Sequence, residues 1–169
     1  MDVEATGNTE ELQSAYTSLR SVYLEKGGLS KRERKEHIRA IKKGLLARKA
    51  QFIAAISEDF GGRSSYETLS AEFLMSMNAA RHALTHIDEW MDTQYPDVYF
   101  ACWPDRLEVR PQPKGVIGII SPWNYPVNLA LIPAIGALAA GNRVLLKPSE
   151  HTPRTSALLK SFLEEALPS

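Results

Sequence analysis

The chain has 169 residues, of which 44% are hydrophobic and 24% are charged, so we expect a single domain with one hydrophobic core. Its 20 Lys and Arg residues balance its 20 Asp and Glu residues, and this neutral charge argues against binding to nucleic acid or to an anionic membrane. The one cysteine, Cys102, excludes an internal disulfide and a metal site with several cysteine ligands, so a cytoplasmic protein is expected.

Two further features bear on targeting and on membranes. The polar stretch from Met1 to Thr9 is typical of neither a signal peptide nor a transit peptide. The longest apolar run, Leu129 to Ala140, has 12 residues, whereas spanning a bilayer takes about 18. We therefore interpret this run as a buried element of a soluble fold.

The first half of the chain has the pattern of a helical region. Residues 9–93 contain no proline, and their apolar residues recur at steps of three and four. Three helical stretches are predicted there: Thr9 to Lys26, Ser30 to Gly61 with a break near Arg48, and Ser64 to Met91. Capping-box patterns, Ser30–Glu33 and Ser64–Glu67, begin the second and third stretches. His82 and His86 are spaced as two metal ligands on one helix face, but no third ligand joins them in a motif, so no metal site is expected.

The second half, residues 94–169, contains all ten prolines and predicts mixed α/β structure. Two short strands, Val98–Phe100 and Leu107–Val109, are predicted to pair across a turn at Pro104 and Asp105. They are followed by a strand, a helix, a strand and a helix: Gly115–Ile120, Pro126–Ala140, Arg143–Lys147 and a last helix that begins at Thr152 and Pro153. The apolar runs predict strands buried on both faces of a parallel sheet with a right-handed crossover. The predicted fold class is α/β, with N-terminal helices followed by a βαβα unit.

Ligands of an open parallel sheet bind beyond the carboxyl ends of its strands, where this chain carries Ser121–Pro126 and Pro148–Glu150. Neither segment is a phosphate-binding glycine loop, because the GxGxxG and GxxxxGK[ST] patterns are both absent. Asn124, between two prolines, is a neutral donor suited to a developing oxyanion, whereas Lys147 and Glu150 suit the two hydroxyls of a ribose. Spacing alone leaves open an Asx-type turn with a packed indole for the first segment and an exposed ion pair for the second.

Three segments resemble the aldehyde dehydrogenase superfamily: PKGVIGIISPWNYP from Pro113, GNRVLLKPSEHTP from Gly141 and DFGGRSSYET from Asp59. The third segment, together with Tyr125, is most similar to the branch that contains coniferyl-aldehyde and fatty-aldehyde dehydrogenases. The resemblance extends over nearly everything after residue 10. It implies that the βαβα unit is the first part of a Rossmann-like sheet.

The resemblance implies a role for six residues. Asn124 matches the amide that holds the substrate oxygen. The cofactor-binding positions are the strand-end residues Ile120, Ser121 and Trp123 and the ribose-binding pair Lys147 and Glu150. The implied cofactor is NAD, with NADP also used in the family, and a carboxylate at Glu150 near the ribose 2′-hydroxyl favours NAD.

The resemblance also divides the chain and implies subunit contacts. Residues 1–94 match the helical part of the cofactor domain, 95–112 a β segment of the subunit-contact sheet, and 113–169 the first βαβα unit of the NAD-binding domain. A homodimer or homotetramer is therefore implied. The resemblance implies that the family's nucleophilic cysteine and general-base glutamate lie beyond the second helix of this unit, outside this sequence. Cys102 is not expected to be that nucleophile, because it lacks the glycine-rich surroundings.

Two functions of different classes follow. The first is an oxidoreductase that uses NAD(P) to oxidise an aldehyde, coniferyl or another aromatic aldehyde by analogy, to the carboxylic acid. This chain would be its amino-terminal portion and inactive alone. The alternative is a non-catalytic α/β module that binds a nucleotide or a partner subunit.

Overall fold

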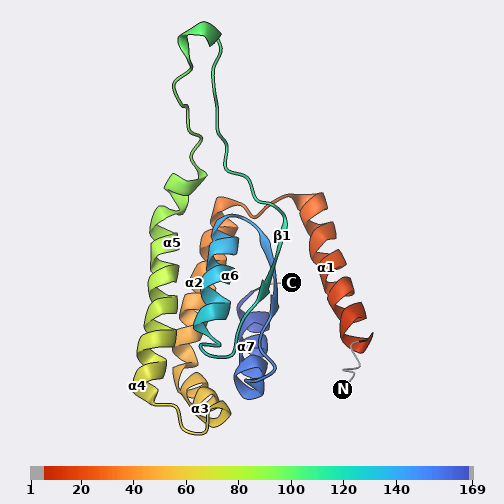
Figure 1. Ribbon diagram of the computed structural model, residues 1–169, viewed down its shortest axis with the longest axis vertical. Coiled ribbons are helices and arrows are strands. Elements are labelled where there is room, and N and C mark those ends of the chain that lie inside the picture. The colour runs from red at the N-terminus through yellow and green to blue at the C-terminus, as the bar shows by residue number, and fades with distance from the viewer. Residues whose placement is uncertain (1–5, 168–169) are drawn as a thin grey trace.

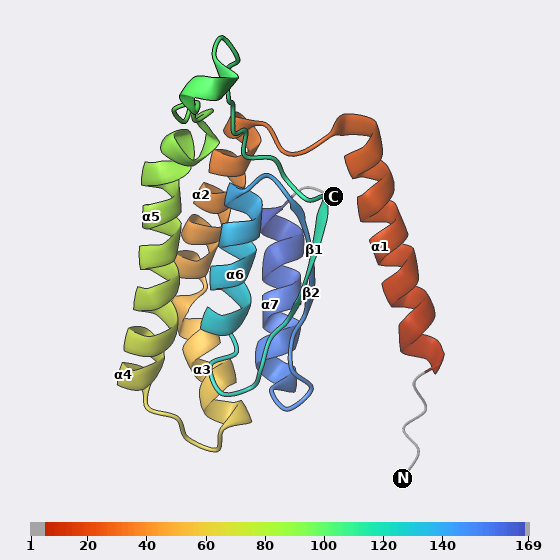
Figure 2. The same ribbon diagram turned by 45° about the horizontal axis from the view of Figure 1, so that its top comes forward.

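The structure, a computed structural model, describes residues 6–167 (Figures 1 and 2). Its elements in chain order are α1 (Thr6–Lys26), α2 (Lys31–Ala47), α3 (Lys49–Asp59), the short α4 (Ser65–Glu67), the π-helical η1 (Thr68–Leu74), α5 (Met75–Met91), the 3₁₀ turn η2 (Phe100–Cys102), β1 (Val116–Ile120), α6 (Asn128–Ala139), β2 (Arg143–Lys147) and α7 (Pro153–Ala166). The predicted succession of N-terminal helices and a βαβα unit is confirmed. In the described part of the chain, no helix is long and apolar enough to cross a membrane.

The sheet consists of β1 and β2, which run parallel in a register that pairs Ile120 with Lys147. Helices α6 and α7 lie on one side of this sheet, and α1 lies on the other (Figure 2). The prediction that both strands are buried on both faces is wrong, because Ile119 is buried while Ile120 is 82% exposed. Strands are buried on both faces only where a full layer of helices covers each face of the sheet. Among residues 6–167, α1 covers only part of the face opposite α6 and α7.

Helix α1 is anchored where the chain enters β1. The Tyr23 hydroxyl donates a hydrogen bond to the Pro113 carbonyl oxygen at 2.9 Å. The Tyr23 ring also packs against Gly115, where a Cβ atom would lie 3.3 Å from two ring carbons. Because Gly115 has a φ of +119°, a side chain there would strain the backbone as well.

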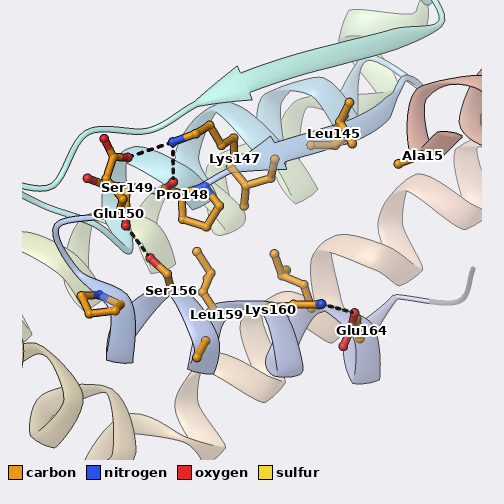
Figure 3. A pocket seen from close by; sticks show the side chains of 15 residues that line it. Ala15, Leu145, Lys147, Pro148, Ser149, Glu150, Ser156, Leu159, Lys160 and Glu164 are labelled. Atoms are coloured by element: carbon orange, nitrogen blue, oxygen red, sulfur yellow. Dashed lines mark hydrogen bonds and ion pairs between the residues drawn. The ribbon is translucent and has the colours of Figure 1, made fainter. Parts of the chain in front are cut away.

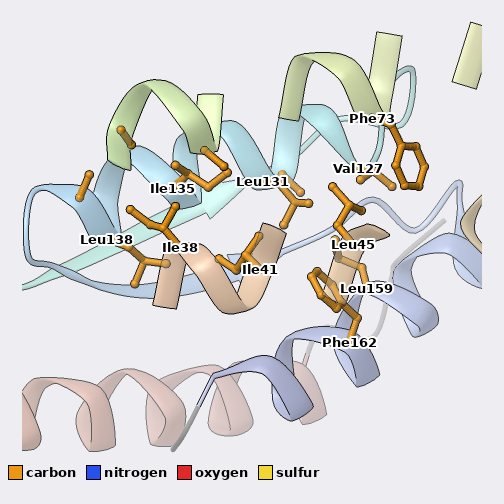
Figure 4. Close-up of a cluster of buried hydrophobic side chains, with 14 of the residues drawn as sticks. Ile38, Ile41, Leu45, Phe73, Val127, Leu131, Ile135, Leu138, Leu159 and Phe162 are labelled. Carbon is orange, nitrogen blue, oxygen red and sulfur yellow. The ribbon is translucent and has the colours of Figure 1, made fainter. Parts of the chain in front are cut away.

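The hydrophobic core lies where α2, α3, α5, α6 and α7 meet, and Figure 4 shows part of it. Its largest fully buried side chains include Ile38, Ile41, Leu45, Phe52, Ile56, Leu131, Ile135, Leu159 and Phe162. The Phe52 ring meets the Phe73 and Phe162 rings edge-on, with centroid separations of 6.2 and 5.9 Å. Gly44 lets α7 approach α2, because a Cβ atom there would lie 2.6 Å from the Phe162 ring. This core fixes the helical half against the face of α6 and α7.

Local start signals are confirmed where both partners lie within one turn. At the start of α2, the Ser30 hydroxyl accepts from the Glu33 amide, and the Glu33 carboxylate accepts from the Ser30 amide at 2.8 Å. The expected break at Arg48 separates α2 from α3. The capping box predicted at Ser64 and Glu67 does not form. The Ser64 hydroxyl accepts from the Tyr66 amide, and the Glu67 carboxylate accepts a hydrogen bond from the Tyr125 hydroxyl instead of the Ser64 amide.

The segment from 95 to 112 extends away from the core as a long arm (Figure 1, green). The predicted strands Val98–Phe100 and Leu107–Val109 are wrong, since η2 occupies part of the first and an isolated bridge joins Gln94 to Val109. The arm's aromatic side chains have no described surface to cover, and Trp103 is 83% exposed. A hairpin without a buried face is marginal. Whether the arm contacts another subunit stays a prediction.

Candidate active site

The carboxyl ends of β1 and β2 bring the two predicted ligand-binding segments to one edge of the sheet. The Ser121 amide donates to the Lys147 carbonyl oxygen at 3.0 Å, so the segment after β1 and the segment after β2 leave the ladder side by side. The Ser121 side chain is buried, and its Oγ finds no hydrogen-bond partner among residues 6–167. The neighbouring Ile120 side chain is exposed. Three of the predicted site residues thus meet here.

The turn that follows β1 presents Asn124 to solvent. Its backbone oxygen accepts a hydrogen bond from Arg63, whereas no partner for its carboxamide is found among residues 6–167. The Trp123 indole is 52% exposed and packs on the Phe60 ring with centroids 6.1 Å apart. An Asx-type turn, in which the Asn side chain bonds to the local backbone, is therefore not formed. The carboxamide is held by its backbone and remains available to a ligand.

Arg63 connects this turn to the helical half. One guanidinium nitrogen donates to the Asn124 carbonyl oxygen at 2.7 Å, and another lies 3.6 Å from the Glu72 carboxylate. The guanidinium also lies over the Phe60 ring, 3.7 Å from its centroid, and 5.1 Å from the Tyr125 centroid. The Arg63 side chain is 10% exposed. Desolvation strengthens its contact with the turn.

Glu72, in η1, caps the helix that follows the turn. Its carboxylate is completely buried and accepts hydrogen bonds from the Val127 amide at 3.1 Å and the Asn128 amide at 2.6 Å. These amides stand at the N-terminus of α6, where a helix has unpaired N–H groups. Burial raises the pKa of Glu72 from 4.5 to about 7, although the two amides and the charge of Arg63 act to lower it.

Lys147 and Glu150 form an ion pair at the edge of an apolar groove of about 750 Å³ between β2 and α7 (Figure 3). The Lys147 Nζ atom lies 2.9 Å from the Glu150 carboxylate, and the side chains are 50% and 72% exposed. The hydrogen bond from Lys147 lowers the pKa of Glu150. An exposed pair of this kind adds little stability, so both groups can exchange their partner for a ligand.

Asp59 caps α7, the helix that follows the loop of Pro148–Glu150. Its carboxylate accepts from the Arg154 amide at 3.2 Å and the Thr155 amide at 2.8 Å, at the start of α7. Thr152 occupies the predicted N-cap position, but its side chain makes no cap hydrogen bond. The predicted start of α7 at Thr152 is thus correct, but the oxygen that accepts from its first amides belongs to Asp59 and not to Thr152.

Arg63, Glu72 and Asp59 hold the two loops through contacts that residue spacing does not predict, although Asp59 and Arg63 stand in the segment DFGGRSSYET that resembles the family. Their partners lie 61, 55 and 96 residues away along the chain. One signal does exist for Glu72: it stands three residues after Leu69 on the inward stripe of the third predicted helix, where a carboxylate interrupts an apolar face. A buried carboxylate on such a face requires partners.

His82 and His86 lie on α5, outside the site. Their rings are 4.1 Å apart, and the His86 ring stacks on Trp90 at 5.9 Å. Within residues 6–167, no group of three His, Cys, Asp or Glu side chains is arranged to hold a metal ion. The pair is thus part of an aromatic stack on the helix surface.

Comparison with known proteins shows the family of this chain. The aldehyde dehydrogenase family matches residues 3–169. The chain is 37% identical over 158 residues to a probable coniferyl aldehyde dehydrogenase of Pseudomonas aeruginosa, a match that covers 94% of this chain and 33% of the relative. A coniferyl aldehyde dehydrogenase of another Pseudomonas is 38% identical over 154 residues, with 91% and 32% covered.

Solved structures show the same fold. Staphylococcus aureus AldH in a substrate-bound state superposes with a TM-score of 0.88 at 23% identity, over 99% of this chain and 35% of that one. A Mycobacterium tuberculosis aldehyde dehydrogenase complexed with NAD⁺ gives 0.79 at 26% identity, over 93% and 32%. The fold is therefore that of the N-terminal part of an aldehyde dehydrogenase. The chain belongs to the aldehyde dehydrogenase family, and it spans about a third of the length of the curated relatives named above.

Proposed function

We propose that this chain serves in an NAD(P)-dependent aldehyde dehydrogenase whose substrate is coniferyl aldehyde or another aromatic aldehyde. The overall change converts an aldehyde, water and NAD(P)⁺ into a carboxylate, NAD(P)H and two protons. The observation that carries the proposal is the exposed carboxamide of Asn124 on a turn whose backbone is held by Arg63. The similarity to two coniferyl aldehyde dehydrogenases along most of the chain supports the substrate class.

Asn124 would stabilise the substrate oxygen as it gains negative charge. A carboxamide NH₂ group donates hydrogen bonds without titrating near neutral pH, so it does not compete for the protons of the reaction. A donor that is already fixed in place has no reorganisation to undergo when the charge develops. The held backbone and the free side chain of Asn124 fit this requirement.

The edge where β1 and β2 end fits the adenosine end of a nicotinamide cofactor. The Lys147 ammonium group donates and the Glu150 carboxylate accepts, which suits the two hydroxyls of a ribose. The buried Ser121 Oγ, without a partner among residues 6–167, and the exposed apolar surface of Ile120 lie at the same edge. When bound, the cofactor supplies the hydride acceptor for the oxidation.

The remaining catalytic groups would be contributed from outside these 169 residues. Cys102 lies exposed in η2 on the arm, at the far end of the molecule from the turn (Figure 1). The nucleophilic thiolate and the general base of the proposed reaction are therefore assigned to sequence that this chain does not contain. The arm itself would contact a second subunit in a dimer or tetramer.

The test is the Asn124→Ala variant of the full-length protein that carries this chain. We expect kcat with coniferyl aldehyde to fall by about 10²–10³-fold, as the loss of one oxyanion donor typically causes, with the KM for NAD unchanged. NADH absorbance measures both. Asn78→Ala, on the exposed face of α5, is the matched control. An unchanged kcat under conditions where chemistry limits turnover would refute the role of Asn124. A full-length protein that oxidises no aldehyde would favour the non-catalytic binding module.

A further inference from the structure

We propose that Arg63 is a positioning residue that holds the Asn124 turn in the geometry needed to stabilise the substrate oxygen. The inference rests on the function proposed above for Asn124. Arg63 lies in the loop between α3 and α4, and it does not itself reach the substrate in this assignment. Its effect passes through the backbone of Asn124.

The turn needs an external support because the sheet holds it at one end only. The Ser121 amide makes the last ladder hydrogen bond, to Lys147. From there to the start of α6, the side chains that contact the turn come from the helical half. They are Phe60 on Trp123, Arg63 on the Asn124 carbonyl, Glu67 on the Tyr125 hydroxyl and Glu72 on the first amides of α6.

Arg63 stands at the centre of these contacts. Its guanidinium donates a hydrogen bond to the Asn124 carbonyl at 2.7 Å and forms an ion pair with the Glu72 carboxylate at 3.6 Å, while its flat face lies on the Phe60 ring. Each contact uses a different part of one rigid planar group, so displacement of the turn disturbs all of them together. The pair with Glu72 links the middle of the turn to its end at α6.

The chemistry of the guanidinium makes Arg63 hard to replace. A lysine ammonium could donate to the Asn124 carbonyl, but it has no planar face to stack on Phe60 and no second nitrogen fixed toward Glu72. Removal of the guanidinium would also leave the buried Glu72 carboxylate without its cation. Misplacement of a reacting or stabilising group by about 1 Å can cost about 10²-fold in rate.

The experiment compares Arg63→Met, Arg63→Lys and the control Arg81→Met in the full-length protein. Arg81 is an exposed arginine of α5 whose guanidinium contacts Asn78 on the same helix. We expect Arg63→Met to lower kcat by about 10–100-fold and leave the KM for NAD within about twofold, with Arg63→Lys between it and the wild type. Arg81→Met should behave as the wild type.

A double-mutant cycle separates positioning from a general structural role. In the Asn124→Ala background, Arg63→Met should cost less than about threefold further, because the group it positions is gone. The proposal is overturned if Arg63→Met lowers kcat in the Asn124→Ala background by the same factor as in the wild type. It is also overturned if Arg63→Met alone leaves kcat unchanged. Asn124→Ala alone reports separately on the function proposed for Asn124.

A second readout does not depend on activity. Crystal structures of Arg63→Met and Arg81→Met should show the Asn124 backbone displaced or disordered in the first and unmoved in the second. Arg63→Lys serves the same comparison if Arg63→Met does not fold. An Asn124 turn that keeps its place without the guanidinium overturns the proposal, whatever the kinetics show.

Discussion

The Asp59 carboxylate, at the end of α3, accepts a hydrogen bond of 2.8 Å from the Thr155 backbone amide, although 96 residues separate the two along the chain. This contact caps α7 directly after the loop that carries Glu150. Glu72 does the same for α6 after the turn that carries Asn124. The helical half thus supplies a carboxylate to each helix that follows a site loop.

We expect Asp59→Ala to lower the free energy of unfolding by about 1–2 kcal/mol, the usual cost of losing a helix cap. Asp59→Asn should recover most of it, since an Asn oxygen also accepts from N-terminal amides. Urea unfolding followed by circular dichroism measures the change. Glu58→Ala is the control, because Glu58 makes an exposed ion pair with Arg154 and its loss should change the stability by less than about 0.5 kcal/mol. Equal losses in the Asp59 and Glu58 variants would contradict the capping role.

A second prediction concerns the pH dependence of stability. Burial raises the pKa of Glu72 from 4.5 to about 7, so between these values the folded protein binds more protons at this site than the unfolded chain. The free energy of unfolding therefore falls as the pH rises through this window. Relative to Glu72→Gln, the wild type should lose about 2–3 kcal/mol between pH 4.5 and 7.

The measurement is urea unfolding of the wild type and of Glu72→Gln at the same pH values. Groups that titrate alike in both proteins cancel in the difference between their free energies of unfolding. Gln at position 72 keeps an oxygen that can accept from the Val127 and Asn128 amides. A difference that stays constant with pH, or that grows in favour of the wild type as the pH rises, would count against a neutral-range pKa for Glu72.

The sequence predicts those features whose partners are close together in the chain. The cap of α2 needs Ser30 and Glu33, three residues apart, and it forms as expected. The contacts of Asp59 and Glu72 join distant residues, and propensity carries no information about which distant helix end a carboxylate will meet. The candidate residues Asn124, Lys147 and Glu150 are at the sheet edge that the βαβ pattern indicates, whereas the support of Arg63 for the turn appears only in three dimensions.

In the arm, the sequence predicts strands that the structure does not form. Val98–Phe100 and Leu107–Val109 have the composition of strands, yet strand pairing depends on a buried face as well as on local preference. Among the described residues nothing covers Tyr99 or Phe100, which are 69% and 78% exposed. The same reason explains why the apolar run of β1 leaves Ile120 exposed.

A third prediction concerns the choice of cofactor. The Glu150 carboxylate carries a negative charge near neutral pH, as an ordinary glutamate does, and its hydrogen bond from Lys147 lowers its pKa further. A ribose 2′-phosphate beside it would meet like charge, so the full-length protein should have a higher kcat/KM with NAD than with NADP. Glu150→Gln should reduce this preference by about 3–10-fold, a modest change because the site is exposed to screening. Steady-state kinetics with NAD and with NADP measure this preference in the wild type and in Glu150→Gln. Glu36→Gln, far from the site, is the control. A wild type that prefers NADP would contradict the ribose assignment of Glu150.

The last prediction concerns residues 1–169 expressed alone, which should self-associate and produce no NADH from aldehydes. Among residues 6–167 the sheet has two strands, so an outer edge of each is unpaired, and Ile120 is 82% exposed beside one of them. Unpaired apolar edges favour pairing with another chain. Light scattering should therefore give a mass above that of the monomer, and Ile120→Lys should lower it, because a charge on an exposed strand opposes edge pairing. Trp103→Ser, on the arm, measures the contribution of the other exposed apolar surface. A monomeric wild type would contradict the edge argument. NADH formation that disappears in Cys102→Ser would show that the exposed cysteine of the arm, and no residue outside this chain, is the nucleophile.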